Sequence, residues 1–337
     1  MTKTVLAIPG DGIGQEVIPA AVRVLQALLP SVRVNWAQAG WETFVETGRA
    51  LPSEVLAQAR AADAVLFGAT ASPSGRVEGY TSPILEFRQR FRLCANLRPV
   101  RTWPAIRALH NEIDLLIVRE NCEGLYIREE QREGEIAWAT RRVTQKGSRR
   151  VAEVAFQQAA HRARARGRVS KVTIIHKANV LNVTDGLFRE VALEVARAYP
   201  HIATEERLVD AAAMLLVQSP QQFDVLLAPN LYGDILSDEA AGLAGGLGLA
   251  PSANIGEGTP VFEPVHGAAP DIAGQGIANP MAAMLSVALM LETWGYPALA
   301  QRLQDALAQV LLTGRVTPDL GGAATTEEFT QHVLQRL

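Results

Sequence analysis

Two aspartates at the start of a predicted helix form the most distinctive chemical pattern in the sequence. Asp234 and Asp238 lie four residues apart in the segment Asn-Leu-Tyr-Gly-Asp-Ile-Leu-Ser-Asp that begins at Asn230. At this spacing both carboxylates project from one helix face, about 5–6 Å apart. Like charges so placed repel each other unless a cation lies between them, and oxygen ligands suit Mg²⁺ or Mn²⁺. The pattern therefore indicates a divalent metal site, although acids near a helix N-terminus are also favoured by the helix dipole alone.

Three arginines could bind the carboxylates of a small acidic substrate. They are Arg88, Arg98, which precedes a proline, and Arg119, which ends an apolar, strand-like run. Guanidinium groups bind carboxylates through two parallel hydrogen bonds. An arginine at the carboxyl end of a strand also points toward the usual ligand site of an α/β sheet. The alternative is that they are solvated surface charges, because the chain has 32 lysines and arginines.

A tyrosine and a lysine could transfer protons. Tyr126 follows Arg119 by seven residues, and Lys177 directly follows the predicted strand 172–176. A lysine near other cations can have a lowered pKa and act as a base, and a tyrosine can deliver a proton to carbon. Taken singly, each also fits a structural interpretation, as a surface lysine and a packed tyrosine.

The elements that must position these residues alternate between strands and helices. Short apolar runs predict strands at 4–9, 32–37, 64–67, 113–118, 172–176 and 225–228, and helical patterns cover 15–29, 52–62, 281–294 and 298–312. Such alternation predicts an α/β fold of mainly parallel strands covered by helices, with ligands at the carboxyl ends of the strands. Loops are predicted at 69–80, 242–258 and 267–280, and the charged segment 124–150 could form a hairpin arm.

The glycine-rich turn Gly10-Asp-Gly-Ile-Gly14 resembles a dinucleotide-binding loop only superficially. It lacks the spacing GxGxxG, and no acidic residue closes the second predicted strand. We interpret it as a tight strand-to-helix turn and expect no Rossmann fold.

Composition and charge exclude several classes of protein. The 337 residues are 48% hydrophobic and 20% charged, which fits two domains or one unit with two lobes. The net charge of −3 argues against binding to nucleic acid or an anionic membrane. The two cysteines show no CxxC spacing, so a disulfide framework or a zinc site is not expected. Without a signal peptide or a long apolar stretch, the expected location is cytoplasmic.

Taken together, these segments resemble the isocitrate, isopropylmalate and homoisocitrate dehydrogenase family over nearly the whole chain. The resemblance lies in 8–14, 95–99, 117–126, 176–179, 230–238 and 263–280. It implies a two-lobed, non-Rossmann isopropylmalate dehydrogenase-like fold with a mixed sheet and a β arm at about 124–150. The large cofactor-binding lobe would comprise 1–98 and 250–337, and the small lobe 99–249. It further implies a homodimer with shared active sites, or a tetramer.

The resemblance also assigns roles within an NAD-dependent, metal-requiring β-decarboxylating site. Arg88, Arg98 and Arg119 would hold the carboxylates of a malate core, with Asn179 also contacting substrate. Asp234 and Asp238 would bind Mg²⁺ or Mn²⁺ together with Asp210 of the partner subunit. The partner subunit's Lys177 would help to remove the 2-hydroxyl proton, and Tyr126 would protonate the enol carbon after CO₂ leaves.

Cofactor binding is implied mainly for the segment 256–280, in which His266 and Asn279 would flank the adenine. The implied NAD-binding residues are Thr70, Ser72, Asn179, Glu263, His266, Gly267, Ala268, Ala269, Pro270, Asp271, Ile272 and Asn279. Asp271 would accept hydrogen bonds from the adenosine ribose, and its carboxylate would repel a 2′-phosphate, which favours NAD over NADP.

The segment before Arg88 should contact the group on C3 of the substrate and so determine which substrate is accepted. Ser72-Pro73 and residues 79–84 look most like homoisocitrate dehydrogenases, which would place the reaction in lysine biosynthesis through aminoadipate. Leu85 stands where some such enzymes have arginine, and it leaves 3-isopropylmalate open, with isocitrate or tartrate as further alternatives. A non-catalytic regulatory subunit usually lacks some of the site residues that are all present here. The related hydroxythreonine-phosphate dehydrogenases use histidine metal ligands, and no histidine stands at 210, 234 or 238.

Overall fold

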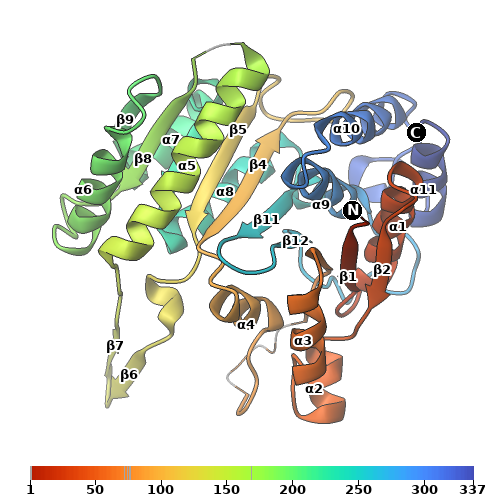
Figure 1. The fold of residues 1–337 in the computed structure, drawn as a ribbon, viewed down its shortest axis with the longest axis horizontal. Coiled ribbons are helices and arrows are strands. Elements are labelled where there is room, and N and C mark those ends of the chain that lie inside the picture. Colours follow the sequence, from red (N-terminus) through yellow and green to blue (C-terminus); the bar gives the residue numbers. More distant parts are fainter. Residues whose placement is uncertain (1, 72, 74, 76, 168) are drawn as a thin grey trace. The chain divides into compact units, whose positions relative to one another are not determined.

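The computed structural model describes residues 2–71, 73, 75, 77–167 and 169–337. It has the expected α/β class, with a mixed sheet flanked by helices (Figure 1). The chain divides into two compact units. The first unit comprises Met1–Arg92, Trp103–Arg107 and Gly245–Leu337, and the second comprises Leu93–Thr102 and Ala108–Ala244.

The described part of the first unit contains five strands in the order β2-β1-β3-β12-β11. They are β1 (Thr4–Ile8), β2 (Arg33–Trp36), β3 (Ala64–Phe67), β11 (Pro251–Ile255) and β12 (Val261–Pro264). All neighbouring pairs are parallel except β11 and β12. β3 is buried along its full length, which explains its uninterrupted apolar sequence. Part of the expected loop 242–258 is in fact strand β11. Its sequence, Pro-Ser-Ala-Asn-Ile, is too short and too weakly periodic to have been predicted as a strand.

Seven α-helices belong to the described part of the first unit. They are α1 (Gly14–Leu28), α2 (Trp41–Thr47), α3 (Ser53–Ala61), α4 (Pro83–Arg90), α9 (Met281–Thr293), α10 (Pro297–Leu312) and α11 (Thr326–Leu334). Helix α9 is buried on nearly every side because it packs against α1, α10, β11 and β12. Two 3-10 turns, η3 (Leu247–Leu249) and η4 (Pro318–Leu320), complete this unit.

In the described part of the second unit, five strands form one sheet region in the order β4-β5-β10-β8-β9. They are β4 (Ala95–Arg101), β5 (Asp114–Glu120), β8 (Lys171–His176), β9 (Ala203–Leu208) and β10 (Val225–Ala228). Only β4 runs antiparallel to its neighbour, so the carboxyl ends of β5, β10, β8 and β9 share one edge. The helices are α5 (Gln145–Arg166), α6 (Thr184–Ala196), α7 (Val209–Gln218) and α8 (Asn230–Ala244), with 3-10 turns η1 (Leu125–Ile127) and η2 (Pro220–Gln222).

The charged segment 124–150 contains a two-stranded hairpin, β6 (Glu130–Glu133) and β7 (Ile136–Ala139), whose residues are all exposed. The expected arm of about 124–150 is shorter than predicted, because the residues from Gln145 onward belong to helix α5. Thr144 caps this helix by accepting a hydrogen bond from the backbone N–H of Gly147 at 3.0 Å. The many arginines of α5 obscure a narrow buried stripe of small and apolar residues, which the sequence analysis missed.

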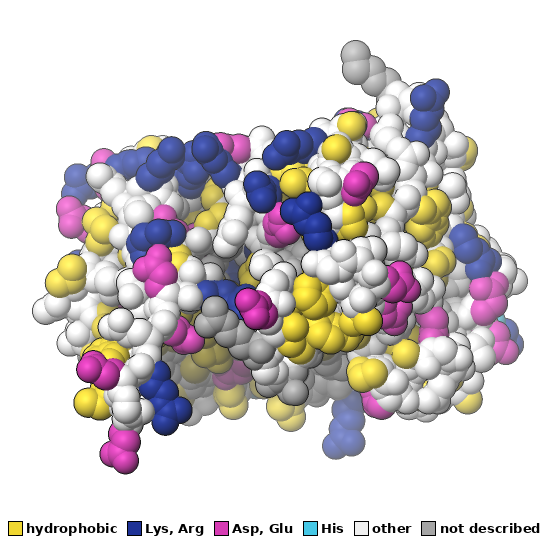
Figure 2. Space-filling view, turned by 90° about the horizontal axis from the view of Figure 1, so that it is seen from below, with side chains coloured by type: hydrophobic (Ala, Val, Ile, Leu, Met, Phe, Trp, Pro, Cys, Tyr) yellow, Lys and Arg dark blue, Asp and Glu magenta, His cyan; other side chains and the backbone are white. Residues whose placement is uncertain are grey.

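The Gly10–Gly14 segment is a tight strand-to-helix turn, as expected. Gly10 and Gly12 have φ values of 75° and 57°, which favour glycine. A Cβ on Gly12 would also lie 2.2 Å from the carbonyl oxygen of Ala268. Acidic and basic side chains are interspersed on the face drawn in Figure 2, in keeping with the small net charge. Within the described residues, no helix is both long and apolar enough to cross a membrane.

Candidate active site

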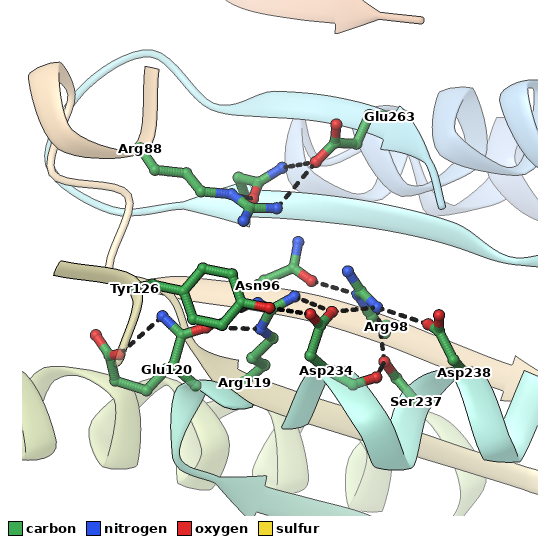
Figure 3. Close-up of polar contacts among 12 residues, drawn as sticks. Arg88, Asn96, Arg98, Arg119, Glu120, Tyr126, Asp234, Ser237, Asp238 and Glu263 are labelled. Atoms are coloured by element: carbon green, nitrogen blue, oxygen red, sulfur yellow. Dashed lines mark hydrogen bonds and ion pairs between the residues drawn. The ribbon is translucent and has the colours of Figure 1, made fainter. Parts of the chain in front are cut away.

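The side chains of Arg98, Arg119, Tyr126, Asp234 and Asp238 converge at one place in the second unit (Figure 3). Arg98 Nη1 lies 3.2 Å from Asp234 Oδ1 and 3.0 Å from Asp238 Oδ1. Arg119 Nη1 donates to the same oxygen of Asp234, and the Tyr126 hydroxyl donates to Asp234 Oδ2. Three elements remote in sequence (β4, β5 and α8) therefore meet at a single carboxylate.

Helix α8 approaches β5 closely because Gly233 has no side chain. A Cβ at Gly233 would lie 2.7 Å from both Cβ and Cγ of Arg119. This approach brings Asp234, the next residue, against the guanidinium group. The ring of Tyr126 covers the other side, with its centroid 4.9 Å from the central carbon of Arg119.

The electrostatic surroundings keep Tyr126 protonated. Burial, and then the hydrogen bond to Asp234, raise the pKa of its hydroxyl above the usual 10.0. Burial also raises the pKa of Asp238 above its usual 3.8, although the charge of Arg98 opposes this effect. A neutral, half-buried tyrosine beside cationic groups is a suitable proton donor.

The carboxylates of Asp234 and Asp238 fit part of a divalent cation site. They lie one helical turn apart on α8, and one oxygen of each lies within 3.2 Å of Arg98 Nη1. Hard oxygen donors of this kind suit Mg²⁺ or Mn²⁺. Among the described residues, no three His, Cys, Asp or Glu side chains gather as a metal-binding group. Two carboxylates from this chain would therefore need further ligands to complete a site.

Lys177 and Asp210 form an ion pair at the same edge of the sheet. Lys177 directly follows β8, and Asp210 lies in the first turn of α7, just after β9. The distance from Lys177 Nζ to Asp210 Oδ1 is 2.6 Å, and this hydrogen bond lowers the pKa of Asp210. The backbone N–H of Lys177 also donates to the buried carboxylate of Asp185 at 2.6 Å. Asn179, two residues after Lys177, is exposed.

Arg88 belongs to α4 of the first unit. Its Nε donates to Asn254 Oδ1 at 3.0 Å, and its Nη2 lies 3.3 Å from Glu263 Oε1. Leu85 lies one helical turn before it and is partly buried. Ser72, which was expected to contact substrate and cofactor, lies outside the described residues, whereas Thr70 is partly buried.

The expected cofactor residues of the segment 256–280 belong to the first unit. The backbone N–H of Ile13 donates to the carbonyl of Ala268 at 2.9 Å, which fixes the loop to the turn at the start of α1. Burial lowers the pKa of His266, whose Nδ1 lies 3.0 Å from the carbonyl oxygen of Gly267. Asp271 is exposed, and Asn279 donates to Asp319 at 3.0 Å. The remaining expected members of this loop are Ala269, Pro270 and Ile272.

Several residues of the site were not identified from the sequence. Three buried asparagines bind the arginines, at positions 96, 230 and 254. The alternation of a strand could have indicated the first, because Asn96 and Arg98 share one face of β4. Nothing local could have indicated Asn254, which is 166 residues from Arg88. Asp11 was also missed; its buried carboxylate accepts hydrogen bonds from the backbone N–H groups of Trp41, Glu42 and Ala71.

Comparison with known proteins identifies relatives over the whole chain. A family described as isocitrate/isopropylmalate dehydrogenase matches residues 4–333. An isocitrate/homoisocitrate dehydrogenase of Thermus thermophilus is 48% identical over 100% of this chain and 99% of its own. A 3-isopropylmalate/3-methylmalate dehydrogenase of Methanocaldococcus jannaschii is 47% identical over 99% of this chain and 98% of its own. The crystal structure of an isocitrate dehydrogenase from Methylococcus capsulatus matches with a TM-score of 0.92 and 42% identity, covering 99% of both chains.

Proposed function

The chain belongs to the isocitrate/isopropylmalate dehydrogenase family and is a β-decarboxylating dehydrogenase; from this premise, we propose that it oxidises homoisocitrate with NAD⁺ to 2-oxoadipate and CO₂. One observation carries the proposal: Asp234 is contacted by two buried arginines and by a protonated tyrosine. This arrangement unites carboxylate-binding groups, a proton donor and part of a cation site. Such a combination suits a 2-hydroxy acid that bears a second carboxylate on C3.

The arginines would bind and orient the substrate. Arg98 and Arg119 are almost completely buried, so their charges act in surroundings of low polarity. Their Nη groups would exchange the contacts with Asp234 and Asp238 for substrate carboxylates, and Arg88 would bind a further carboxylate. Bidentate contacts of this kind fix both the position and the plane of a carboxylate.

Proton transfer would use two residues at opposite stages of the reaction. Lys177, from the partner subunit, would accept the 2-hydroxyl proton as C2 is oxidised and its hydride leaves. The bond between C3 and its carboxylate then breaks, CO₂ departs, and the electron pair remains in the enol. Tyr126 would donate a proton to C3 and so complete the 2-oxo acid.

NAD⁺ would accept the hydride from C2, and a divalent cation held by Asp234, Asp238 and the partner's Asp210 would polarise the 2-hydroxyl and 2-oxo oxygens. We assign cofactor binding to the segment 256–280, which includes Glu263 and His266, and to Thr70, Ser72 and Asn179. The exposed carboxylate of Asp271 would favour NAD⁺ by repelling a 2′-phosphate. Because Lys177 and Asp210 act in the partner's site, the active form would be a cytoplasmic homodimer or a tetramer.

The identity of the C3 substituent rests on the segment before Arg88. The Thermus thermophilus relative named for isocitrate and homoisocitrate supports a carboxylate-bearing substituent, which Ser72 would bind. A second candidate is 3-isopropylmalate, favoured by the apolar side chain of Leu85 one turn before Arg88 and by the Methanocaldococcus jannaschii relative. Isocitrate and tartrate are the remaining alternatives.

A substrate panel tests the proposal. NADH formation would be measured with Mg²⁺ or Mn²⁺, and kcat/KM compared for homoisocitrate, isocitrate, 3-isopropylmalate and tartrate, with NADP⁺ and metal-free reactions as controls. We expect homoisocitrate to give the highest value and chelation of the metal to abolish turnover. A higher value for 3-isopropylmalate would reject the assigned substrate, and turnover of none of the four would reject the proposed reaction.

A further inference from the structure

Each of the three arginines donates a hydrogen bond from Nε to the side-chain oxygen of an asparagine (Figure 3). The distances are 3.0 Å from Arg88 to Asn254, 2.7 Å from Arg98 to Asn96, and 3.0 Å from Arg119 to Asn230. Arg119 makes a second contact with Asn230, through Nη2 at 2.7 Å. The same pairing thus recurs in both units, once within β4, once between α4 and β11, and once between β5 and α8.

The asparagines are fixed parts of the framework. They lie on β4, at the start of α8 and on β11, and the exposed fractions of Asn96, Asn230 and Asn254 are 0%, 2% and 0%. Asn230 donates to Glu120 Oε2 at 3.3 Å and to the carbonyl of Glu123 at 3.1 Å.

In the first unit, Asn254 donates to Glu263 Oε1 at 2.8 Å and to the carbonyl of Val261 at 3.2 Å. Because the amide nitrogens of Asn230 and Asn254 are engaged by acceptors, their side-chain oxygens must face the arginines.

An asparagine oxygen differs from a carboxylate in one decisive way. Both accept a hydrogen bond from Nε and so fix the plane of the guanidinium group. The amide is neutral, whereas a buried carboxylate at this distance would cancel most of the positive potential that an anionic substrate experiences. Neutral anchoring at Nε therefore provides orientation without adding a further negative charge to those of Glu263, Asp234 and Asp238, which already contact the Nη groups.

We infer that Asn96, Asn230 and Asn254 are positioning residues, which hold the arginines at Nε through neutral acceptors and so orient them for substrate carboxylates without adding to the negative charge around them. This inference rests on the proposed function, because it takes the three arginines as the substrate-binding groups. It adds a set of residues that determine how strongly a polycarboxylate is bound.

Asn96 offers the sharpest test, because the glutamates that accept from Asn230 and Asn254 would repel a new carboxylate at those two positions. Asn96→Ala removes the acceptor, and Asn96→Asp retains it but adds a negative charge. We expect each variant to raise the substrate KM by about tenfold or more, as for a lost charge-assisted contact, with Asp at least as harmful as Ala. The KM for NAD⁺ should stay within about twofold. Asn254→Ala is the second variant in case both Asn96 variants fail to fold, and it should raise the substrate KM similarly.

Asn121→Ala is the matched control. This buried asparagine of the second unit donates to the carbonyl of Leu93 at 3.0 Å rather than serving an arginine. This variant should lower Tm without changing the ratio of the substrate KM to the NAD⁺ KM. An Asn96→Asp enzyme with the wild-type substrate KM would overturn the charge argument. If the KM for substrate and the KM for NAD⁺ changed equally, and Tm fell as in the control, the asparagines would have only a structural role.

Calorimetric titration with malate, which carries only the shared dicarboxylate core, separates this inference from the proposed reaction. If the wild-type enzyme turns over no substrate in the panel, the proposed reaction fails, but weaker malate binding by Asn96→Asp would still support neutral anchoring. Equal malate affinities for wild type and variant, or no binding to either, would overturn it.

Discussion

The carboxylate of Asp11 accepts a hydrogen bond from the backbone N–H of Ala71 at 2.8 Å, and the carbonyl of Ala71 accepts one from the Tyr80 hydroxyl at 3.0 Å. Both backbone polar groups of this loop residue are therefore fixed by side chains. Asp11 also accepts from the N–H groups of Trp41 and Glu42 at the start of α2. Gly40, whose φ is 145°, leaves the space that these contacts need, since a Cβ there would lie 2.5 Å from Asp11 Oδ2.

Replacement of Asp11 should loosen both α2 and the loop around Ala71. We expect Asp11→Ala to lower the free energy of unfolding by about 1–3 kcal/mol, because buried backbone donors lose their acceptor. Tyr80→Phe keeps the ring contacts with Trp41 and Phe44 and should cost about 1 kcal/mol or less. Hydrogen exchange should accelerate at residues 41, 42 and 71 for Asp11→Ala. Thr47→Ala, at the exposed end of α2, serves as the control, and unchanged exchange in Asp11→Ala would contradict the expected role.

Removal of the Tyr126 hydroxyl should slow turnover more than it weakens binding. Tyr126→Phe keeps the ring over Arg119 but removes the proton donor, so we expect kcat to fall by about 10²–10⁴ with little change in substrate KM. Exchange of solvent deuterium into C3 of the 2-oxo product would fall in parallel. Tyr232→Phe is the matched control, because the ring of Tyr232 also faces an arginine, Arg141, whose Nη1 donates to the Tyr232 hydroxyl. Normal exchange in Tyr126→Phe would exclude Tyr126 as the donor.

Two glycines of α8 should respond oppositely to alanine. A Cβ at Gly233 would meet Arg119 at 2.7 Å, so Gly233→Ala should cost about 1–3 kcal/mol and displace the guanidinium group from Asp234. Nothing lies within 4 Å of a Cβ at Gly242, so Gly242→Ala should stabilise the helix by about 0.5–1 kcal/mol. Denaturant unfolding and kcat/KM measure both effects. If the two variants behave alike, the close approach of α8 to β5 is not what holds Arg119.

Asp224 should make stability depend on acid pH. It joins the end of α5 to the sheet by accepting from Arg162 Nε at 2.8 Å, Arg166 Nη1 at 2.9 Å and the Ser170 hydroxyl. Burial raises its pKa, but the hydrogen bond from Ser170 and the two arginine charges outweigh burial, so the pKa lies below the usual 3.8.

A carboxyl group with a lowered folded-state pKa stabilises the protein above its unfolded pKa, and this stability is lost as the pH falls through the folded value. The difference in unfolding free energy between wild type and Asp224→Asn should therefore be constant from about pH 5 to 8 and shrink below about pH 4. Ser170→Ala should raise the folded pKa of Asp224 and move this loss to higher pH. A difference that persists unchanged at pH 3 would show that Asp224 acts without its charge.

The sequence by itself determined the parts of the site that depend on local spacing. Asp234 and Asp238 share a face of α8 because four residues make about one helical turn. The apolar runs became strands, Arg119 and Lys177 lie at strand ends, and Gly10–Gly14 is a turn, since each follows from short-range periodicity or from glycine backbone freedom. Helix α5 and strand β11 were missed because the buried pattern of each is short or obscured by charge.

The tertiary structure decided which of these residues touch. Arg119 reaches Asp234 across 115 residues of sequence, and Arg88 reaches Asn254 across 166. Such contacts depend on which strands become neighbours and on the register between them, and side-chain spacing along the chain contains no information about either. Two buried arginines, a tyrosine and an aspartate become one site only when β4, β5 and α8 pack together, because only packing removes the water that would otherwise separate their charges.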